Sequence, residues 1–175
     1  MIRKEKSPPG KEFFTFVVVT VSDKGSRGLR HDRSGEIVSE LLKNEGFVQK
    51  DYTVIPDEKK EIEEKIKLYA DKTGVDLVIT NGGTGVSPRD RTPEATREVL
   101  DREIPGMAEA MRAESLRKTP HAMLSRAVCG IRKNTLIVNL PGSPKAAKEN
   151  LAVIIPALPH AIKKIKGDPT DCATP

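Results

Sequence analysis

The feature that most constrains this chain is a repeated order of a short apolar run, a polar or glycine-rich loop and a helix-patterned segment. Residues 13–21 read FFTFVVVTV and residues 76–80 read DLVIT. Neither run shows a regular alternation with polar residues, which is typical of strands buried on both faces of a parallel sheet. Parallel neighbours need a crossover that lays a helix on the sheet. The sequence therefore predicts an α/β fold, a three-layer α/β/α sandwich with a mostly parallel central sheet.

The remaining segments fit this architecture. Apolar residues recur at helical spacing in several places, and one more short run has strand composition. Proline marks expected helix starts at Pro56-Asp57, at Thr92-Pro93 with Thr92 as the N-cap, and at Ser143-Pro144. Two apolar runs separated by Arg-Lys-Asn predict a small β-hairpin. The helix that Pro56-Asp57 opens has its apolar face at residues 62–69. The further predicted helices cover residues 37–42, 107–116 and 158–166, the further strand residues 52–55, and the hairpin residues 127–131 and 135–140.

The expected position of a ligand follows from this topology. Open parallel sheets bind ligands beyond the carboxyl ends of their strands. The loops after Val21, Thr80 and Leu140 should share that edge, and the glycines of the sequence are concentrated there. We therefore expect the functional site in these loops.

The length and the ends of the chain suggest its organisation. A chain of 175 residues suits one compact domain, which we place at residues 13–168, with flexible tails at residues 1–12 and 169–175. The first twelve residues lack the apolar centre of a signal peptide, and no apolar run reaches the roughly 20 residues of a membrane helix. The two cysteines show neither metal-site spacing nor a disulfide framework. These features predict a soluble, cytoplasmic protein without a membrane partner.

The charge of the chain bears on its partners. The net charge is +5, but residues of both signs are scattered along the chain. Aromatic residues make up only 3% and tryptophan is absent, so the stacking platforms of single-strand binders are missing. We expect small anionic molecules and not nucleic acid as the partners.

A glycine loop is the first candidate binding motif. Gly82, Gly83, Thr84 and Gly85 directly follow a predicted buried strand, where they can turn sharply and offer backbone N–H groups to a phosphate. A glycine-rich turn without a ligand is the alternative. Asp90, between two arginines beside this loop, is the candidate to hold a metal ion near phosphates, and an ion pair with those arginines is its alternative.

Three more motifs lie at expected strand ends. Asp57 is explained most simply as a helix N-cap or first-turn acid. The turn from Asn139 to Ser143 joins a strand to a helix N-terminus, which suits a phosphate or a capped turn. Ser22 and Asp23 supply polar groups after the first strand, or stabilise a turn.

The motifs in sequence order resemble the MoaB/Mog domain family. They are VSDKGSRG from Val21, IPD from Ile55, GGTG from Gly82, RDRTPEA from Arg89, LSR from Leu124 and NLPGSP from Asn139. Each motif is common alone, but their order and spacing are specific, and the resemblance covers residues 16–167.

This resemblance implies a molybdopterin adenylyltransferase of molybdenum cofactor biosynthesis. Such an enzyme transfers AMP from ATP to the terminal phosphate of molybdopterin with Mg²⁺ and releases pyrophosphate. It also implies a homotrimer or hexamer and hand-over to a molybdenum-insertion protein. Asp57 and Asp90 match the essential acids. Asp90 is the candidate Mg²⁺ ligand, and which of the two acids holds the ion stays open at this point. The implied nucleotide- and pterin-binding positions are Ser22, Asp23, Gly82, Gly83, Thr84, Gly85, Thr92, Ser125, Asn139, Pro141, Gly142 and Ser143.

Two alternatives to this activity stay open at the level of sequence. The chain lacks the insertion of some bacterial adenylyltransferases and looks more like the MoaB branch, some members of which only bind pterin. A non-catalytic molybdopterin-binding or assembly protein is therefore the second hypothesis. An RNA-binding or general anion-binding domain, suggested by the pI of 9.2 alone, is the third.

Overall fold

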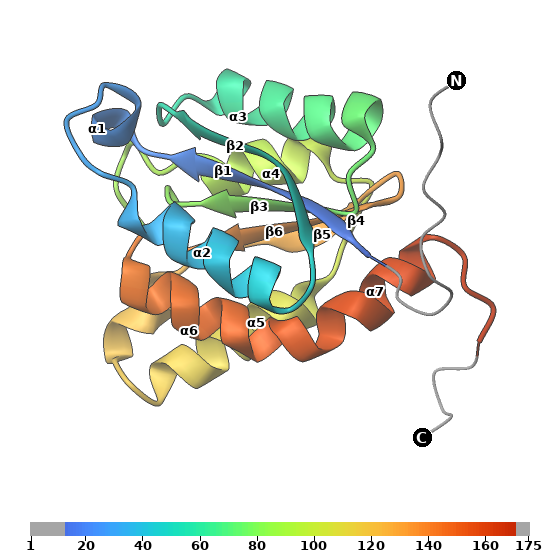
Figure 1. Cartoon of the computed structure of the whole chain (residues 1–175). Helices are drawn as coiled ribbons and strands as arrows, with labels where there is room; N and C mark the ends of the chain where they lie inside the picture. The colour runs from blue at the N-terminus through green and yellow to red at the C-terminus, as the bar shows by residue number, and fades with distance from the viewer. Residues whose placement is uncertain (1–12, 171–175) are drawn as a thin grey trace.

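The computed structural model describes residues 13–170, so the tail predictions for residues 1–12 and 171–175 lie outside the described part. Figure 1 shows one sheet between two layers of helices, as the sequence predicts. The strands are β1 (Thr15–Val21), β2 (Val48–Ile55), β3 (Leu77–Asn81), β4 (Arg102–Glu103), β5 (Cys129–Arg132) and β6 (Thr135–Leu140). The α-helices are α1 (Asp23–Ser26), α2 (Arg33–Asn44), α3 (Lys59–Lys67), α4 (Thr92–Val99), α5 (Pro105–Leu116), α6 (Pro144–Ile154) and α7 (Leu158–Ile165). Shorter helices are the π-helix η1 (Leu68–Thr73) and the 3₁₀ helices η2 (Pro120–Leu124) and η3 (Ile155–Ala157).

The sheet is parallel in its centre and antiparallel at one edge. Its strand order within residues 13–170 is β2-β1-β3-β6-β5-β4, and β2, β1, β3 and β6 run parallel. The predicted hairpin is confirmed as β5 and β6, and β6 also pairs with β3, so the hairpin belongs to the main sheet. The two-residue edge strand β4 was not predicted, because both of its residues are charged and exposed.

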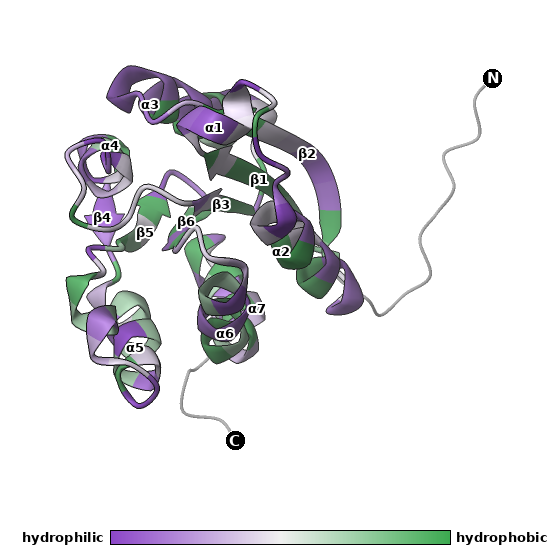
Figure 2. Ribbon diagram, turned by 90° about the vertical axis from the view of Figure 1, so that its left-hand side faces the viewer, coloured by the Kyte–Doolittle hydropathy of each residue, from purple (hydrophilic) through white to green (hydrophobic). Residues whose placement is uncertain are grey.

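The central strands are apolar throughout because helices cover both of their faces. Phe16 and Val18 of β1 pack in a core with α2, α5, α6 and α7, whereas Val17 and Val19 pack in a second core with α3 and α4. Figure 2 shows these helices on opposite sides of the sheet. Side chains of a strand point alternately to its two faces, so burial of both faces removes the polar alternation. None of the helices within residues 13–170 is long and apolar enough to cross a membrane.

The helix predicted to start at Thr92-Pro93 is confirmed, but its predicted cap residue is wrong, and the helix predicted to start at Pro56-Asp57 begins later. Helix α3 begins at Lys59 after the N-cap residue Glu58, and α4 begins at Thr92 after the N-cap residue Arg91. Asp57 and Thr92 therefore do not cap these helices, because both side chains bind other loops. The prediction for α6 is confirmed, since the Ser143 hydroxyl accepts the Ala146 N–H.

The ends of three parallel strands are level with one another, as predicted. Thr20 of β1 pairs with Asn81 of β3, and Asn81 pairs with Leu140 of β6. The Gly82 N–H donates to the Leu140 carbonyl at 2.9 Å, which joins the loops that follow β3 and β6. Figure 2 looks onto this carboxyl edge, with the one-turn helix α1 beside it. The loops expected to hold the site therefore meet there.

Candidate active site

The glycine loop passes so close to its neighbours that side chains would not fit. Gly82 and Gly83 have φ values of +110° and +64°, in the left-handed region. A Cβ on Gly82 would lie 2.4 Å from the Val21 carbonyl oxygen, and one on Gly83 would lie 2.4 Å from the Thr92 hydroxyl. Backbone alone therefore occupies this position at the centre of the carboxyl edge.

Thr92 holds the glycine loop in place through two hydrogen bonds. Its hydroxyl donates to the Gly82 carbonyl at 2.9 Å and its N–H donates to the Gly83 carbonyl at 3.2 Å. The residue is completely buried and does not line either of the cavities described next. Thr92 therefore supports the loop and is not positioned to contact a ligand.

Two cavities open on the carboxyl edge and share one wall. The α5-side cavity has a volume of about 470 Å³, and the α2-side cavity one of about 430 Å³. Their common wall consists of Gly83, Asp90, Gly142 and Ser143. The α5-side cavity also includes Thr84, Gly85, Arg112, Leu124, Ser125 and Pro141, and the α2-side cavity also includes Ser22, Arg30, His31, Asp32, Arg33, Asp57, Asn81 and Gly82. The structure thus brings together most of the residues singled out in the sequence.

Asp57 is held by the loop after β1. Its carboxylate accepts the Asp23 N–H at 2.8 Å, and the Asp57 N–H donates to the Asp23 carboxylate at 3.1 Å. Burial raises the pKa of Asp57, and the negative charges of Asp23 and Asp90 raise it further, although the bond from the Asp23 N–H opposes them. Negative charge on the Asp57 carboxylate is therefore disfavoured in the free protein, and a bound cation would stabilise it.

Asp90 is oriented from within its own loop. Its carboxylate accepts the Ser87 N–H at 2.8 Å. The expected alternative, an ion pair with a flanking arginine, is wrong for Arg89, which binds Asp23 at 2.9 Å and Glu58 at 2.8 Å. Among the described residues, Asp90 makes no ion pair with Arg91 either. Asp90 lines both cavities, and its Oδ1 accepts no hydrogen bond from the described residues.

Asp23 has a different role from the two cavity carboxylates. The hydrogen bond from Arg89 lowers the pKa of Asp23, and the Asp57 N–H lowers it further. Asp23 does not line either cavity. It joins the loop after β1 to Asp57 and to Arg89, so its position is structural.

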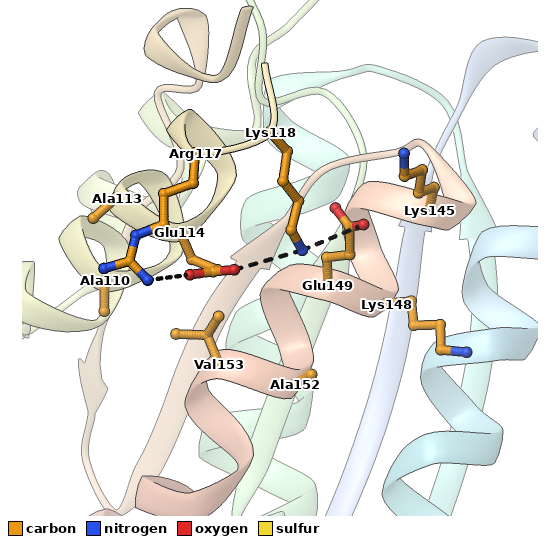
Figure 3. Close-up of a pocket in the computed structure, with 10 residues that line it drawn as sticks. All are labelled: Ala110, Ala113, Glu114, Arg117, Lys118, Lys145, Lys148, Glu149, Ala152 and Val153. Atoms are coloured by element: carbon orange, nitrogen blue, oxygen red, sulfur yellow. Dashed lines mark hydrogen bonds and ion pairs between the residues drawn. The ribbon is translucent and has the colours of Figure 1, made fainter. Parts of the chain in front are cut away.

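The turn before α6 forms part of the wall between the cavities. A Cβ on Gly142 would lie 3.2 Å from the Gly82 Cα, which shows how closely the turn approaches the glycine loop. Ser143 caps α6, and the free N–H groups and positive dipole of a helix N-terminus favour an anion. Lys145 lies in a separate groove between α5 and α6 and lines neither cavity (Figure 3).

The predicted ligand-binding residue Asn139 lines neither of the two cavities. It is completely buried, and its amide donates to the hydroxyls of Thr80 at 2.7 Å and Thr96 at 2.9 Å. Its carbonyl accepts the Val128 N–H at 3.1 Å. With these groups satisfied, Asn139 joins β6 to β3, α4 and the start of the hairpin, away from both cavities.

Asn81 and Arg112 are among the cavity residues that were missed at the level of sequence. Asn81 is 1% exposed. Its side-chain carbonyl accepts the Ser34 hydroxyl at 3.1 Å, and its side-chain amide nitrogen has no partner among the described residues. A polar residue at the end of a buried strand was the available signal. Arg112 reaches the α5-side cavity from within α5, and its helical surroundings give no such signal.

Comparison with known families identifies the class of protein to which this fold and its paired cavities belong. Residues 17–160 match the family described as "Probable molybdopterin binding domain", and the chain belongs to this family.

Individual relatives fall in the same group. The chain is 42% identical to a protein of Helicobacter pylori named molybdopterin adenylyltransferase, over 86% of this chain and 87% of that protein. A crystal structure of the molybdopterin biosynthesis enzyme MoaB from Thermus thermophilus superposes with a TM-score of 0.85 at 53% identity, covering 91% of this chain and all of that one. The chain spans about a quarter of two longer relatives: 26% of the Drosophila melanogaster protein cinnamon, at 42% identity, and 25% of Dictyostelium discoideum gephyrin, at 41%.

Proposed function

We propose that this chain is a molybdopterin adenylyltransferase of molybdenum cofactor biosynthesis, which transfers AMP from ATP to molybdopterin and releases pyrophosphate. The observation that carries the proposal is the pair of cavities that meet at Gly83, Asp90, Gly142 and Ser143. Transfer between two substrates needs two adjoining spaces whose reacting ends meet. The Helicobacter pylori relative, which bears the name of this activity and matches 86% of the chain, supports the same reaction.

The chemistry asks for positioning more than for proton transfer. An oxygen of the terminal phosphate of molybdopterin forms a bond to the α-phosphorus of ATP. The bond from that phosphorus to the oxygen shared with the β-phosphate breaks, and this oxygen leaves with pyrophosphate. The attacking oxygen is already ionised at neutral pH, so the residues of the wall need to align the substrates and stabilise negative charge.

The wall between the cavities can supply that stabilisation. The loop at Gly82 and Gly83 offers backbone without side chains, and the capped N-terminus of α6 offers N–H groups at Ser143. Such preorganised donors bind phosphate oxygens and gain strength where water is excluded. We assign these groups to the phosphates at the point of transfer.

Asp57 and Asp90 are suited to hold Mg²⁺. Both line the α2-side cavity, and the negative charge of Asp90 helps to raise the pKa of Asp57. Within the described residues, no cluster of three or more acidic, histidine or cysteine side chains could hold a metal alone. Mg²⁺ is commonly bound by one or two carboxylates together with substrate phosphates, so the pair fits this ion. When bound, Mg²⁺ would neutralise charge on the phosphates.

Measurement of pyrophosphate release tests the activity. Purified protein is incubated with Mg·ATP, with and without molybdopterin, alongside Asp57→Asn, Asp90→Asn and the control Asp71→Asn, whose carboxylate binds Arg132 outside the cavities. Release that depends on molybdopterin and falls by about 100- to 1,000-fold in the first two variants is expected. A folded parent that binds molybdopterin but releases no pyrophosphate would instead identify a non-catalytic pterin-binding protein.

The assembly and the location of the protein extend this proposal. The family resemblance supports a homotrimer or hexamer in the cytoplasm that passes its product to a molybdenum-insertion protein. Light scattering of the purified chain measures the assembly directly, and a monomer at micromolar concentration contradicts it.

A further inference from the structure

One arginine outside the cavity wall binds the loop that carries Asp90. Arg126 lies between η2 and β5, directly after Ser125. Its backbone N–H donates to the Thr84 carbonyl at 2.9 Å. Its side chain donates through Nε to the Gly85 carbonyl at 2.6 Å and through Nη2 to the Asp90 carbonyl at 2.8 Å. A single residue thus binds three carbonyls of the segment 84–90.

The other contacts described for this segment are local or exposed. Ser87 and Asp90 bind each other in both directions, through the Asp90 N–H to the Ser87 carbonyl and the Ser87 N–H to the Asp90 carboxylate. Arg89 extends outward to an exposed pair with Asp23 and Glu58. The bonds between Ser87 and Asp90 fix the shape of the turn, and Arg89 joins it to acids of the loops after β1 and β2. Arg126 connects the turn to the segment that leads into β5.

Glu94 holds the guanidinium in its orientation. It lies in the first turn of α4 and forms an ion pair with Nη1 of Arg126. Burial is the largest single influence and would raise the pKa of Glu94. The hydrogen bond from Arg126, the backbone hydrogen bond at Glu94 and the positive charges of Arg126 and Arg97 together outweigh burial, so the pKa lies below its ordinary value. The planar guanidinium therefore has a carboxylate on one side and the two loop carbonyls on the others. Lysine has one charged nitrogen and cannot reproduce this fork.

We propose that Arg126 is a positioning residue of the site. It keeps the glycine loop and the backbone of Asp90 in the place from which the Asp90 carboxylate faces both cavities. The carboxylate is bonded to Ser87 in the same turn, so a displaced turn would displace the carboxylate with it. This inference rests on the proposed function, in which Asp90 and Asp57 hold Mg²⁺ beside the phosphates.

The test compares two arginines of similar bonding at opposite edges of the sheet. Arg132 binds Asp71 and donates to the Val99 carbonyl at 2.8 Å, far along β5 from the cavities. Arg126→Ala, Arg126→Lys and the control Arg132→Ala are assayed for kcat and KM at a temperature where each is folded. Hydrogen exchange of the amides of residues 84–91 is measured in the same proteins.

Arg126→Ala is expected to lower kcat about 100-fold with a change in KM for molybdopterin below about threefold, because misplaced groups reduce turnover more than binding. Arg126→Lys should lose about tenfold. Exchange in residues 84–91 should accelerate at least about tenfold in Arg126→Ala and stay unchanged in Arg132→Ala.

Unchanged exchange in this segment, or a loss of kcat in Arg126→Ala no larger than that in Arg132→Ala, overturns the proposal. A parent that releases no pyrophosphate contradicts the proposed function and not the role of Arg126. The exchange of residues 84–91 then decides by itself whether Arg126 holds the loop.

Discussion

The two edges of the sheet differ in how the charges of their acidic residues are balanced. At the amino edge, Asp76 is buried, accepts the N–H and the hydroxyl of Thr15 at 2.7 and 2.9 Å, and forms an ion pair with Lys166. Asp71 binds the guanidinium of Arg132, and this hydrogen bond lowers the pKa of Asp71. Each acid there has a cation and satisfied oxygens.

At the carboxyl edge Asp23 is paired with Arg89, but the cavity carboxylate of Asp57 makes no ion pair among the described residues. Burial and two neighbouring acids raise the pKa of Asp57. Asn81 has a buried amide nitrogen without a partner among the described residues, and Gly82 and Gly83 adopt left-handed backbone conformations. The buried charge of Asp57 and the unpartnered amide of Asn81 cost stability in the free protein, and a bound ligand or cation can relieve them. The comparison indicates that the amino edge is built for stability and the carboxyl edge for binding.

The largest effect is expected at Asp57, where a substitution should lower activity but raise stability. Asp57→Asn should reduce pyrophosphate release about 1,000-fold, equivalent to about 4 kcal/mol in the barrier. The same variant should unfold about 1–3 °C higher at neutral pH, because an unfavourable charge is removed while the amide oxygen can still accept the Asp23 N–H. Calorimetry and the release assay measure the two effects, and a lower Tm would contradict the comparison.

The opposite pattern is expected at Asp76, where a substitution should lower stability and leave turnover unchanged. Asp76→Ala leaves the Thr15 N–H and the Lys166 ammonium without their acceptor. The free energy of unfolding should fall by about 3 kcal/mol, with turnover unchanged in the folded protein. Urea denaturation measures this loss. Impaired turnover in folded Asp76→Ala would show that the two edges are coupled.

The features predicted correctly depend on local pattern. Apolar runs identified the central strands, the serine-proline pair marked the start of α6, and parallel topology placed the loops after Val21, Thr80 and Leu140 together. Each of these rests on residues close in sequence or on a rule of chain geometry. The reaction came from the order of motifs and not from these patterns.

The features predicted wrongly or missed depend on distant partners. Asp57 and Thr92 have the composition of helix starts, but tertiary bonds to Asp23 and Gly82 use their side chains instead. Asn139 lies in a strand-end motif, yet three buried partners satisfy it. Arg126 reaches Asp90 across 36 positions of sequence, and no local pattern encodes that contact.

A pair of buried asparagines sharpens the comparison within the carboxyl edge itself. Asn139→Ala removes bonds to two hydroxyls and one backbone N–H and should cost about 2 kcal/mol of unfolding free energy. Asn81→Ala removes one bond to Ser34 and an amide nitrogen that has no described partner, so it should cost less than about 1 kcal/mol. Denaturant titration compares them, and equal losses would contradict a binding role for the free amide.

The smallest expected effect is the pH dependence of stability, which has opposite signs at the two edges. The pKa of Asp57 is raised from 3.8, so its charged form destabilises the fold, and the advantage of Asp57→Asn over the parent should shrink as the pH falls toward 3.8 and vanish below it. The pKa of Asp71 is lowered from 3.8, so its contribution is complete above 3.8 and is lost as the pH falls through the lowered value. Asp71→Asn should therefore be less stable than the parent at neutral pH and approach it in acid. Thermal unfolding followed by circular dichroism from about pH 3 to about pH 8 compares both variants with the parent. If Asp57→Asn and Asp71→Asn changed the thermal stability of the parent in the same direction at neutral pH, the charges at the two edges would not be balanced differently. The assignment of stability to one edge and binding to the other would then rest on the hydrogen bonds alone.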